Sequence, residues 1–193
     1  MLLLRNKVLQ GNWDKEVANL PFFPHTDYDL LGNEAVAFRS EDGKINTFYR
    51  SKQPENPANF HYTKLYYACP ELKKLIEYFK VEKTRIRIHK QRPGINTRLH
   101  SDYQNKLGTT FKDYLVRVKV GLTYSPDFEW HFKLPKEDVK TYELLRGQCV
   151  LFDPDIIWHG MANNSKIDTR YSLLMMVKPN KWLYNFFAEK YAT

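Results

Sequence analysis

Alternation of apolar and charged residues along the second half of the chain constrains its fold more than any other feature. Residues 85 to 89 read Arg-Ile-Arg-Ile-His, and residues 114 to 120 repeat the pattern with valines and basic residues. Successive side chains of a β-strand point to opposite faces, so this period of two predicts strands at both places. Further short strands are expected at residues 130–134, 142–145, 149–152 and 170–177. Many short strands separated by turns are typical of a sandwich or small barrel, and we expect a mainly β, jelly-roll barrel with helices outside it.

We expect a single domain that covers residues 1–193, with the barrel core at residues 84–178. Residues 1–83 form an N-terminal extension, in which apolar residues at helical spacing predict a helix near residues 70–80. An amphipathic pattern predicts a C-terminal helix within residues 180–193.

Two features of the extension point to structure within it. Asp42-Gly43 is a turn signal between two apolar runs, residues 35–38 and 45–48, and predicts a β-hairpin. The segment is also rich in aromatic residues, which would form either a lid over a substrate pocket or ordinary core: Trp13, Phe22, Phe23, Phe38, Phe48 and Tyr49.

The net charge and the cysteine content indicate which partners the protein could bind and in which cellular compartment it would occur. The 193 residues carry a formal net charge of +8, and 42% of them are hydrophobic, a composition that folds into a globule. Lysine and arginine are scattered rather than clustered, which disfavours a nucleic-acid partner. Cys69 and Cys149 show no pairing pattern, and no apolar run reaches the length of a membrane span. We therefore expect a cytoplasmic protein with reduced thiols and no membrane partner.

The motif His100-Ser101-Asp102 is the first indication of chemistry. It lies in an extended segment, where a period of two places His100 and Asp102 on one face of the strand. An imidazole beside a carboxylate provides two corners of a facial triad, which a distant histidine completes while three metal positions stay open. The chain contains six histidines, so the motif alone is weak and depends on its context.

His159 and Arg170 supply that context. His159 ends an apolar run, Arg170 opens the next expected strand, and residues 163–166 have the composition of a turn. We expect this turn to close an antiparallel hairpin in which His159 and Arg170 lie almost opposite each other. An arginine there can bind one carboxylate of a dicarboxylate while a metal holds the other end. The alternative for Arg170 is a charge that faces solvent on the hairpin.

Arg117 and Lys119 share one face of a predicted strand, and valines share the other. Alternation alone favours a half-buried strand with both charges in water. The functional alternative places both charges at the mouth of the barrel near an anionic ligand, and periodicity does not decide between the two. Two further histidines are weaker candidates. His89 is expected to be a packing or surface residue, and His131 lacks a carboxylate at ligand spacing.

The order and approximate spacing of four stretches resemble the 2-oxoglutarate-dependent aspartyl/asparaginyl β-hydroxylase family, whose relatives include free-proline hydroxylases. The resemblance covers about residues 84 to 178, and the residues before it match only loosely. The matching stretches are Pro93-Gly94 followed by His100, then residues 117–122, then residues 147–153 followed by His159, and lastly Arg170.

The resemblance implies a double-stranded β-helix, a cupin-like barrel, in an enzyme that uses O2. It implies Fe(II) bound by His100, Asp102 and His159, and Arg170 paired with the C5 carboxylate of 2-oxoglutarate. It also implies that Arg117 contacts this cosubstrate. Lys119 falls where the vertebrate enzyme carries a histidine, so its part in cosubstrate binding does not transfer directly. The vertebrate enzyme lacks the triad carboxylate, whereas this chain has Asp102, as the proline hydroxylases do.

The activity implied is that of a dioxygenase that hydroxylates an amino-acid side chain, either in a free amino acid or in an Asp, Asn or Pro residue of a peptide or protein. Two alternatives come from other classes. One is a non-catalytic barrel of cupin type that binds a small molecule or a partner protein. The other is an oxygenase that acts on nucleic acid, which the positive net charge alone favours.

Overall fold

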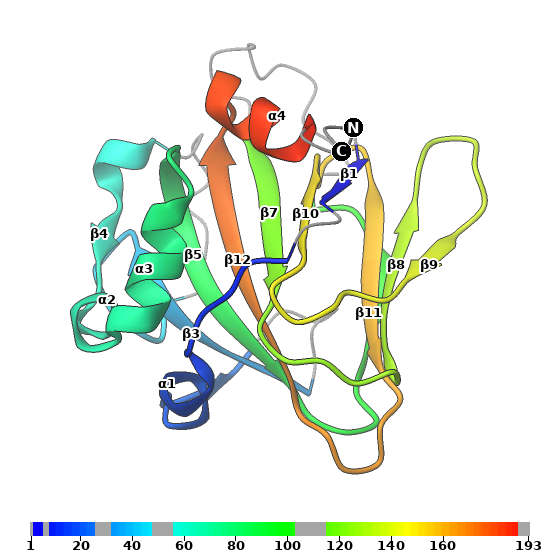
Figure 1. Ribbon diagram of the computed structural model, residues 1–193, viewed down its shortest axis with the longest axis horizontal. Helices are drawn as coiled ribbons and strands as arrows, with labels where there is room; N and C mark the ends of the chain where they lie inside the picture. The colour runs from blue at the N-terminus through cyan, green and yellow to red at the C-terminus, as the bar shows by residue number, and fades with distance from the viewer. Residues whose placement is uncertain (1, 6–7, 26–31, 48–55, 103–114, 189–193) are drawn as a thin grey trace.

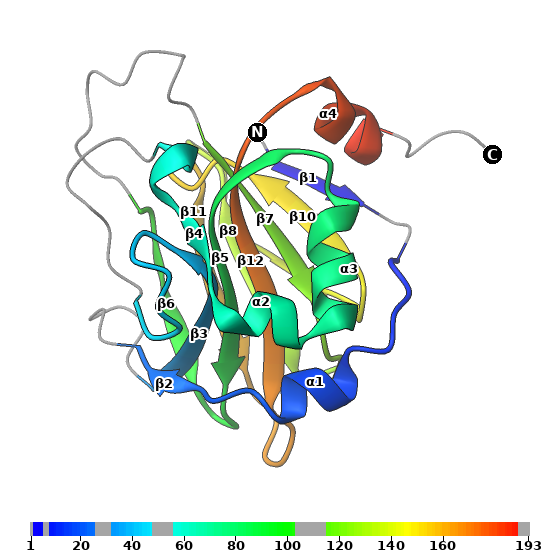
Figure 2. The same ribbon diagram turned by 90° about the vertical axis from the view of Figure 1, so that its left-hand side faces the viewer.

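The computed structural model describes residues 2–5, 8–25, 32–47, 56–102 and 115–188, and it shows two antiparallel β-sheets with helices over one of them (Figures 1 and 2). The larger sheet has the strand order β1-β10-β7-β12-β5-β3-β2, and β4 pairs with β3 off this path. Its strands are β1 (Leu2–Arg5), β2 (Phe23–Pro24), β3 (Asn33–Ser40), β4 (His61–Tyr62), β5 (Glu82–Gln91), β7 (Val116–Gly121), β10 (Cys149–Phe152) and β12 (Arg170–Lys178).

The smaller sheet has the order β6-β11-β8-β9 and stands opposite the larger one, on the side away from α2 and α3 (Figure 1). Its strands are β6 (Asn96–His100), β8 (Phe128–Lys133), β9 (Lys140–Tyr142) and β11 (Trp158–Asn163). The helices are α1 (Asp14–Ala18), α2 (Lys64–Ala68), α3 (Pro70–Tyr78) and α4 (Lys181–Ala188), with a short 3-10 helix at Pro57–Asn59. No helix in the described part of the chain is both long and apolar enough to cross a membrane.

The outer face of the larger sheet packs against the helices and forms the main hydrophobic core. The apolar positions of α3 and α4, such as Leu72 and Phe186, are buried against alternate residues of the central strands. Those strand residues are Ile86, Ile88, Val116, Val118, Val120, Leu173, Met175 and Val177. Trp13 and Phe38 belong to the same core, so these two aromatic residues are ordinary core residues and not part of a lid. Phe48 and Tyr49 lie outside the described residues.

The inner face of the larger sheet looks toward the smaller sheet, and it too is buried. All six residues of β7 are buried, with the valines in the main core and the basic side chains between the sheets. A second apolar cluster lies between the two sheets, where Trp130 and Phe132 of β8 pack with Val150 and Phe152 of β10. Of the two alternatives left open for Arg117 and Lys119, the one with both charges in water is therefore wrong, because both faces of this sheet are covered.

The jelly-roll expectation is confirmed. The strand expected at 142–145 is wrong apart from its first residue, because β9 covers Lys140–Tyr142 and residues 143–145 lie outside any strand, whereas the other predicted strands overlap observed ones. The C-terminal helix is described to Ala188. In the extension, Ile45 lies in a turn rather than in a second strand, although its carbonyl accepts a hydrogen bond from the Ala37 N–H at 2.8 Å. The backbone beyond Thr47 in that predicted hairpin lies outside the described residues.

One pairing prediction is wrong: β11 and β12 do not form a hairpin. β11 pairs with β6 and β8 in the smaller sheet, whereas β12 pairs with β5 and β7 in the larger one. The segment between them therefore crosses from one sheet to the other. The Asn163 side-chain amide donates hydrogen bonds to the Gln91 carbonyl (3.0 Å) and the Asp168 carbonyl (2.8 Å), which fixes this crossing. The composition of a turn does not specify whether the strands on either side of it pair.

Candidate metal centre and anion pocket

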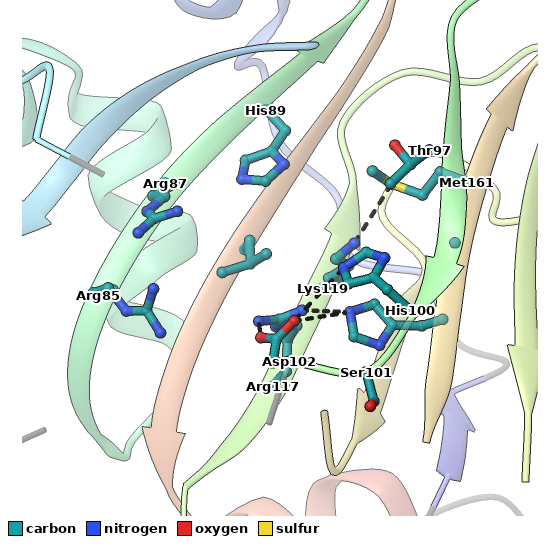
Figure 3. A pocket seen from close by; sticks show the side chains of 13 residues that line it. Arg85, Arg87, His89, Thr97, His100, Ser101, Asp102, Arg117, Lys119 and Met161 are labelled. Carbon is teal, nitrogen blue, oxygen red and sulfur yellow. Dashed lines mark hydrogen bonds and ion pairs between the residues drawn. The ribbon is translucent and has the colours of Figure 1, made fainter. Parts of the chain in front are cut away.

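His100, Asp102 and His159 come together at one place between the two sheets. Figure 3 shows two of them, His100 and Asp102, beside Arg117. His100 ends β6, Asp102 follows two residues later, and His159 of β11 lies directly opposite His100 in the antiparallel ladder. One ligand-type atom from each residue lies within 4.8 Å of the others. Asp102 Oδ1 is 3.6 Å from the Nε2 atom of His100 and 3.6 Å from that of His159.

Backbone contacts orient both imidazoles. The Nδ1 atom of His100 lies 2.8 Å from the Arg98 carbonyl oxygen, and that of His159 lies 3.0 Å from the Ile157 carbonyl oxygen. A carbonyl only accepts, so each Nδ1 carries a proton and each Nε2 is the nitrogen left to bind a metal. Histidines that bind metals are commonly held in this way, with the second ring nitrogen donating to a carbonyl or carboxylate.

Gly160 allows the close approach of β11 and β6 beside these histidines. The register between the two strands shifts after His159, and a Cβ atom on Gly160 would lie only 2.9 Å from the Thr97 carbonyl oxygen. A side chain at this position would push the strands apart. The glycine therefore keeps His159 next to His100.

Arg117 of β7 bridges two members of the group. Its Nη1 lies 2.7 Å from His159 Nε2, and its Nη2 donates to Asp102 Oδ2. Burial acts to raise the pKa of Asp102, but its neighbours together, with the charge of Arg117 the largest among them, outweigh burial and hold the pKa well below its usual range. Burial lowers the pKa of His159 well below its usual range, and Arg117 adds to this effect. The group thus combines an ionised carboxylate with a neutral imidazole, the protonation states that a metal requires.

Lys119 and Arg170 both lie against the ring of Trp130. Lys119 Nζ is 4.3 Å from the ring centroid and 3.4 Å from Met161 Sδ, while Arg170 Cζ is 4.2 Å from the same centroid. Both residues are almost completely buried. Burial lowers the pKa of Lys119 well below its usual range, and the charge of Arg117 contributes; burial also lowers the pKa of Arg170 to about 9.

Arg170 is held by the smaller sheet. Its Nη1 donates to the Glu129 carbonyl at 2.7 Å and to the Ala162 carbonyl at 3.3 Å. Its Nη2 is buried with no hydrogen-bond partner in the described part of the protein. The solvent-facing alternative for Arg170 is therefore wrong. Arg170 lies in the opposite sheet from His159 rather than across a hairpin from it.

A pocket of about 290 Å³ opens between the sheets and contains the group. Five of the six residues that the sequence singled out line it, and Arg170 does not: His100, Asp102, His159, Arg117 and Lys119. The pocket also contains three residues of β5 that the sequence analysis did not place there: Arg85, Arg87 and His89. The period of two shows that these three share a face. It does not show that this face lines a cavity.

The surface alternative for His89 is wrong, and so is the expectation that His131 has no carboxylate at ligand spacing, because Glu129 lies beside it on the same strand. His89 is buried, and neither ring nitrogen has a hydrogen-bond partner among the described residues. His131 lies on β8 between Trp130 and Phe132, which face the interior. It contacts Glu129 at 3.5 Å and Thr141 at 3.2 Å, and it does not line the pocket.

Two imidazoles on β6 and β11 and one carboxylate just beyond β6 form the donor set of non-haem Fe(II) sites, which leaves the other positions of an octahedral ion open to ligands. The residues present therefore fit Fe(II). The buried basic side chains next to them fit a carboxylate-bearing ligand.

Comparison with known proteins gives the fold but no sequence family. No protein-family model matches the sequence, and no curated protein matches it either. A 2OG-Fe(II) oxygenase family oxidoreductase from Burkholderia pseudomallei has a similar structure, with a TM-score of 0.57 and 14% identity over 84% of this chain and 75% of that one. OsALKBH1 matches with a TM-score of 0.55 and 12% identity, over 92% and 96% of the two chains. The non-heme alpha ketoglutarate dependent epimerase SnoN from nogalamycin biosynthesis matches with a TM-score of 0.51 and 14% identity, over 85% and 68%. The chain has the mainly β, jelly-roll fold of these proteins.

Proposed function

We propose that this protein is an Fe(II)- and 2-oxoglutarate-dependent dioxygenase that hydroxylates an amino-acid side chain, in a free amino acid or in a peptide. One observation carries the proposal: the ligand atoms of His100, Asp102 and His159 converge within 4.8 Å inside a pocket between two sheets. Similar folds in a 2OG-Fe(II) oxygenase family member and in an alpha ketoglutarate dependent epimerase support it at the level of the fold.

In this proposal the two Nε2 atoms and the Asp102 carboxylate hold the iron. When bound, Fe(II) with 2-oxoglutarate and O2 supplies the oxidising power for attack on a C–H bond. The chain's own contribution is to hold both imidazoles with their Nε2 lone pairs directed at the ion and to keep Asp102 ionised. The buried walls of the pocket limit the access of water to the reaction.

Lys119 and Arg170 are the proposed anchor for the C5 carboxylate of 2-oxoglutarate. Both side chains lie against the ring of Trp130, and a buried cation is costly unless an anion pairs with it. Lys119 lines the pocket, and Arg170 Nη2 has no hydrogen-bond partner among the described residues. A carboxylate that reaches these side chains would provide that anion.

Arg117 has a second proposed role at the cosubstrate. Its guanidinium now donates toward His159 Nε2, and this lone pair is the one that an iron ion would take. Metal binding would therefore release one N–H of Arg117. This N–H would then be free to bind a carboxylate of 2-oxoglutarate next to the metal.

The size of the pocket supports a small substrate or a single side chain. A volume of about 290 Å³ accommodates 2-oxoglutarate together with one amino-acid side chain, but not a large folded surface. This agrees with hydroxylation of a free amino acid or of a residue that a peptide inserts.

Turnover separates this proposal from the alternative of a non-catalytic cupin-type barrel, which would use the same pocket only for binding. We expect the purified protein to bind one Fe(II) and to convert 2-oxoglutarate slowly to succinate even without its substrate. The His100→Ala variant should do neither. Stoichiometric iron without any succinate, under aerobic conditions with reductant present, would favour the binding barrel instead.

A further inference from the structure

A second row of basic side chains faces the pocket from β5, apart from the row on β7. Arg85, Arg87 and His89 alternate with the core residues Ile86 and Ile88 and project from β5 toward the pocket (Figure 3). All three are buried, with exposed fractions of 8%, 5% and 5%. Nothing in the proposed metal or cosubstrate site uses them.

The order of the strands separates the two rows. β12 lies between β7 and β5, and its Leu174 reaches the pocket between the rows. Neighbouring strands are about 4.8 Å apart, so the β5 row lies roughly 10 Å from the β7 row. A cosubstrate held at the metal and at Lys119 occupies the β7 side. The β5 side is left to a second ligand.

The charge of the pocket indicates what that ligand is. Among the described residues of its lining, Asp102 is the carboxylate and four side chains are basic: Arg85, Arg87, Arg117 and Lys119. Fe(II), Asp102 and the two carboxylates of 2-oxoglutarate together carry a single negative charge, which one basic side chain balances. Arginine stays protonated at every physiological pH. The basic side chains that line the pocket therefore favour an anionic ligand over a neutral one.

His89 adds an independent observation about the same wall. Both of its ring nitrogens are buried without a hydrogen-bond partner among the described residues, and buried polar groups in native proteins are almost always satisfied. The ring lies among the positive charges of His25, Lys119, Arg87 and Arg117, and burial together with these charges keeps its pKa well below the usual range. A neutral imidazole offers one N–H donor to a ligand in the pocket.

We propose that Arg85 and Arg87 bind a compact anionic group of the substrate, a carboxylate or a phosphate, at the β5 wall while the carbon to be oxidised lies at the metal, beside the β7 row. This inference rests on the proposed function and adds the charge of the substrate. Arg87 is positioned for this by His25, whose Nε2 lies 3.4 Å from its Nη1. A free amino acid or a short peptide with an acidic group apart from the oxidised carbon fits the description.

Simple anions test the subsite without knowledge of the substrate. The anaerobic protein is loaded with Fe(II) and saturating 2-oxoglutarate, and the visible charge-transfer band of chelated 2-oxoglutarate reports that the metal site is occupied. Inorganic phosphate or acetate is then titrated at constant ionic strength, and thermal unfolding is followed. We expect a saturable rise in Tm. The Arg85→Gln and Arg87→Gln variants should keep the band and bind the anion roughly tenfold more weakly or worse.

Arg92→Gln is the matched control, because it removes the same charge just beyond the end of β5. The Arg92 side chain is 62% exposed, is paired with Glu34, and lies outside the pocket. It should behave as wild type. If Arg87→Gln does not fold, Arg87→Lys keeps the charge but loses the planar fork and should weaken binding several-fold.

The outcomes separate the two claims. Absence of the band in the wild-type protein contradicts the proposed function. A normal band with no effect of either anion overturns the β5 subsite alone, and so does anion binding that is unchanged in both glutamine variants. Binding of phosphate alone or of acetate alone supports the subsite and identifies the chemistry of the substrate's anionic group.

Discussion

The two faces of the central strands β5, β7 and β12 are both buried, yet they have opposite compositions. The outer face is isoleucine, valine, leucine and methionine packed under the helices. The inner face of β5 and β7 carries arginine, lysine and histidine around a pocket, with Leu174 of β12 between the two strands. Where charges do occur at the rim of the outer face, they pair with each other, as Glu34 does with Lys90 and Arg92 at 2.6 Å. The outer face thus stabilises the protein, whereas the inner face carries the basic side chains that we propose bind charged ligands.

The largest effect is expected for a change at the inner face. His159→Ala should abolish iron binding and turnover, because two ligands no longer complete the facial triad. Iron content after anaerobic reconstitution measures this directly. His131→Ala provides the matched control, since His131 lies on the adjacent strand outside the pocket. Full iron retention in His159→Ala would remove His159 from the proposed ligand set.

A substitution on the outer face should do the reverse. Ile88→Ala deletes a fully buried side chain from the main core, and such deletions cost about 2–5 kcal/mol of unfolding free energy. Urea denaturation should show this loss. The affinity for Fe(II) and 2-oxoglutarate at temperatures where the variant is folded should be unchanged. Equal damage to stability and to cofactor binding would mean that the two faces are not separable.

Arg170→Ala should act on the cosubstrate and spare the metal. Loss of a charge-assisted hydrogen bond to a carboxylate is worth about 1.5–3 kcal/mol, so the apparent requirement for 2-oxoglutarate should rise roughly tenfold or more. The Lys119→Met variant measures how much Lys119 contributes to 2-oxoglutarate binding compared with Arg170, because Lys119 lines the pocket and Arg170 does not. A normal dependence on 2-oxoglutarate in Arg170→Ala would show that Arg170 does not bind the cosubstrate.

The smallest effect on stability is expected for Glu34, at the rim of the outer face. Burial acts to raise the pKa of Glu34, but hydrogen bonds from Lys90 and Arg92 outweigh it and lower the pKa. A carboxyl with a lowered folded-state pKa stabilises above its unfolded pKa and loses that contribution as the pH falls through its folded pKa. Glu34→Gln should therefore cost about 1 kcal/mol at neutral pH. The difference from wild type should shrink below about pH 4. A pH-independent difference in chemical denaturation would show that the ion pair is not its source.

Much of this arrangement follows from the sequence, and the errors have physical causes. Alternation predicts the strands and the division of residues between faces, and the His-x-Asp motif with a distant histidine predicts the group that converges in the pocket. Alternation does not indicate whether a polar face meets water or a cavity, so the β5 row was missed. The sequence signal that could have found it is the run of basic residues at alternate positions on β5.

The pairing of strands that are far apart in the chain is harder to predict from the sequence. The loop after Asn163 has the composition of a hairpin turn, but the strands on either side enter different sheets. The same applies to β1, which pairs with β10, and to β3, which pairs with β5. These pairings depend on contacts between segments far apart in the chain, and local composition carries no information about them.

The most direct test of the central claim is an anaerobic titration of the metal-free protein with Fe(II) and 2-oxoglutarate, followed by visible absorption. The proposed site predicts the weak charge-transfer band of 2-oxoglutarate chelated to a facial-triad iron, present in wild type and His131→Ala and lost in His100→Ala. A folded, iron-loaded protein that shows no such band would contradict the account and leave the pocket as a binding site of another kind.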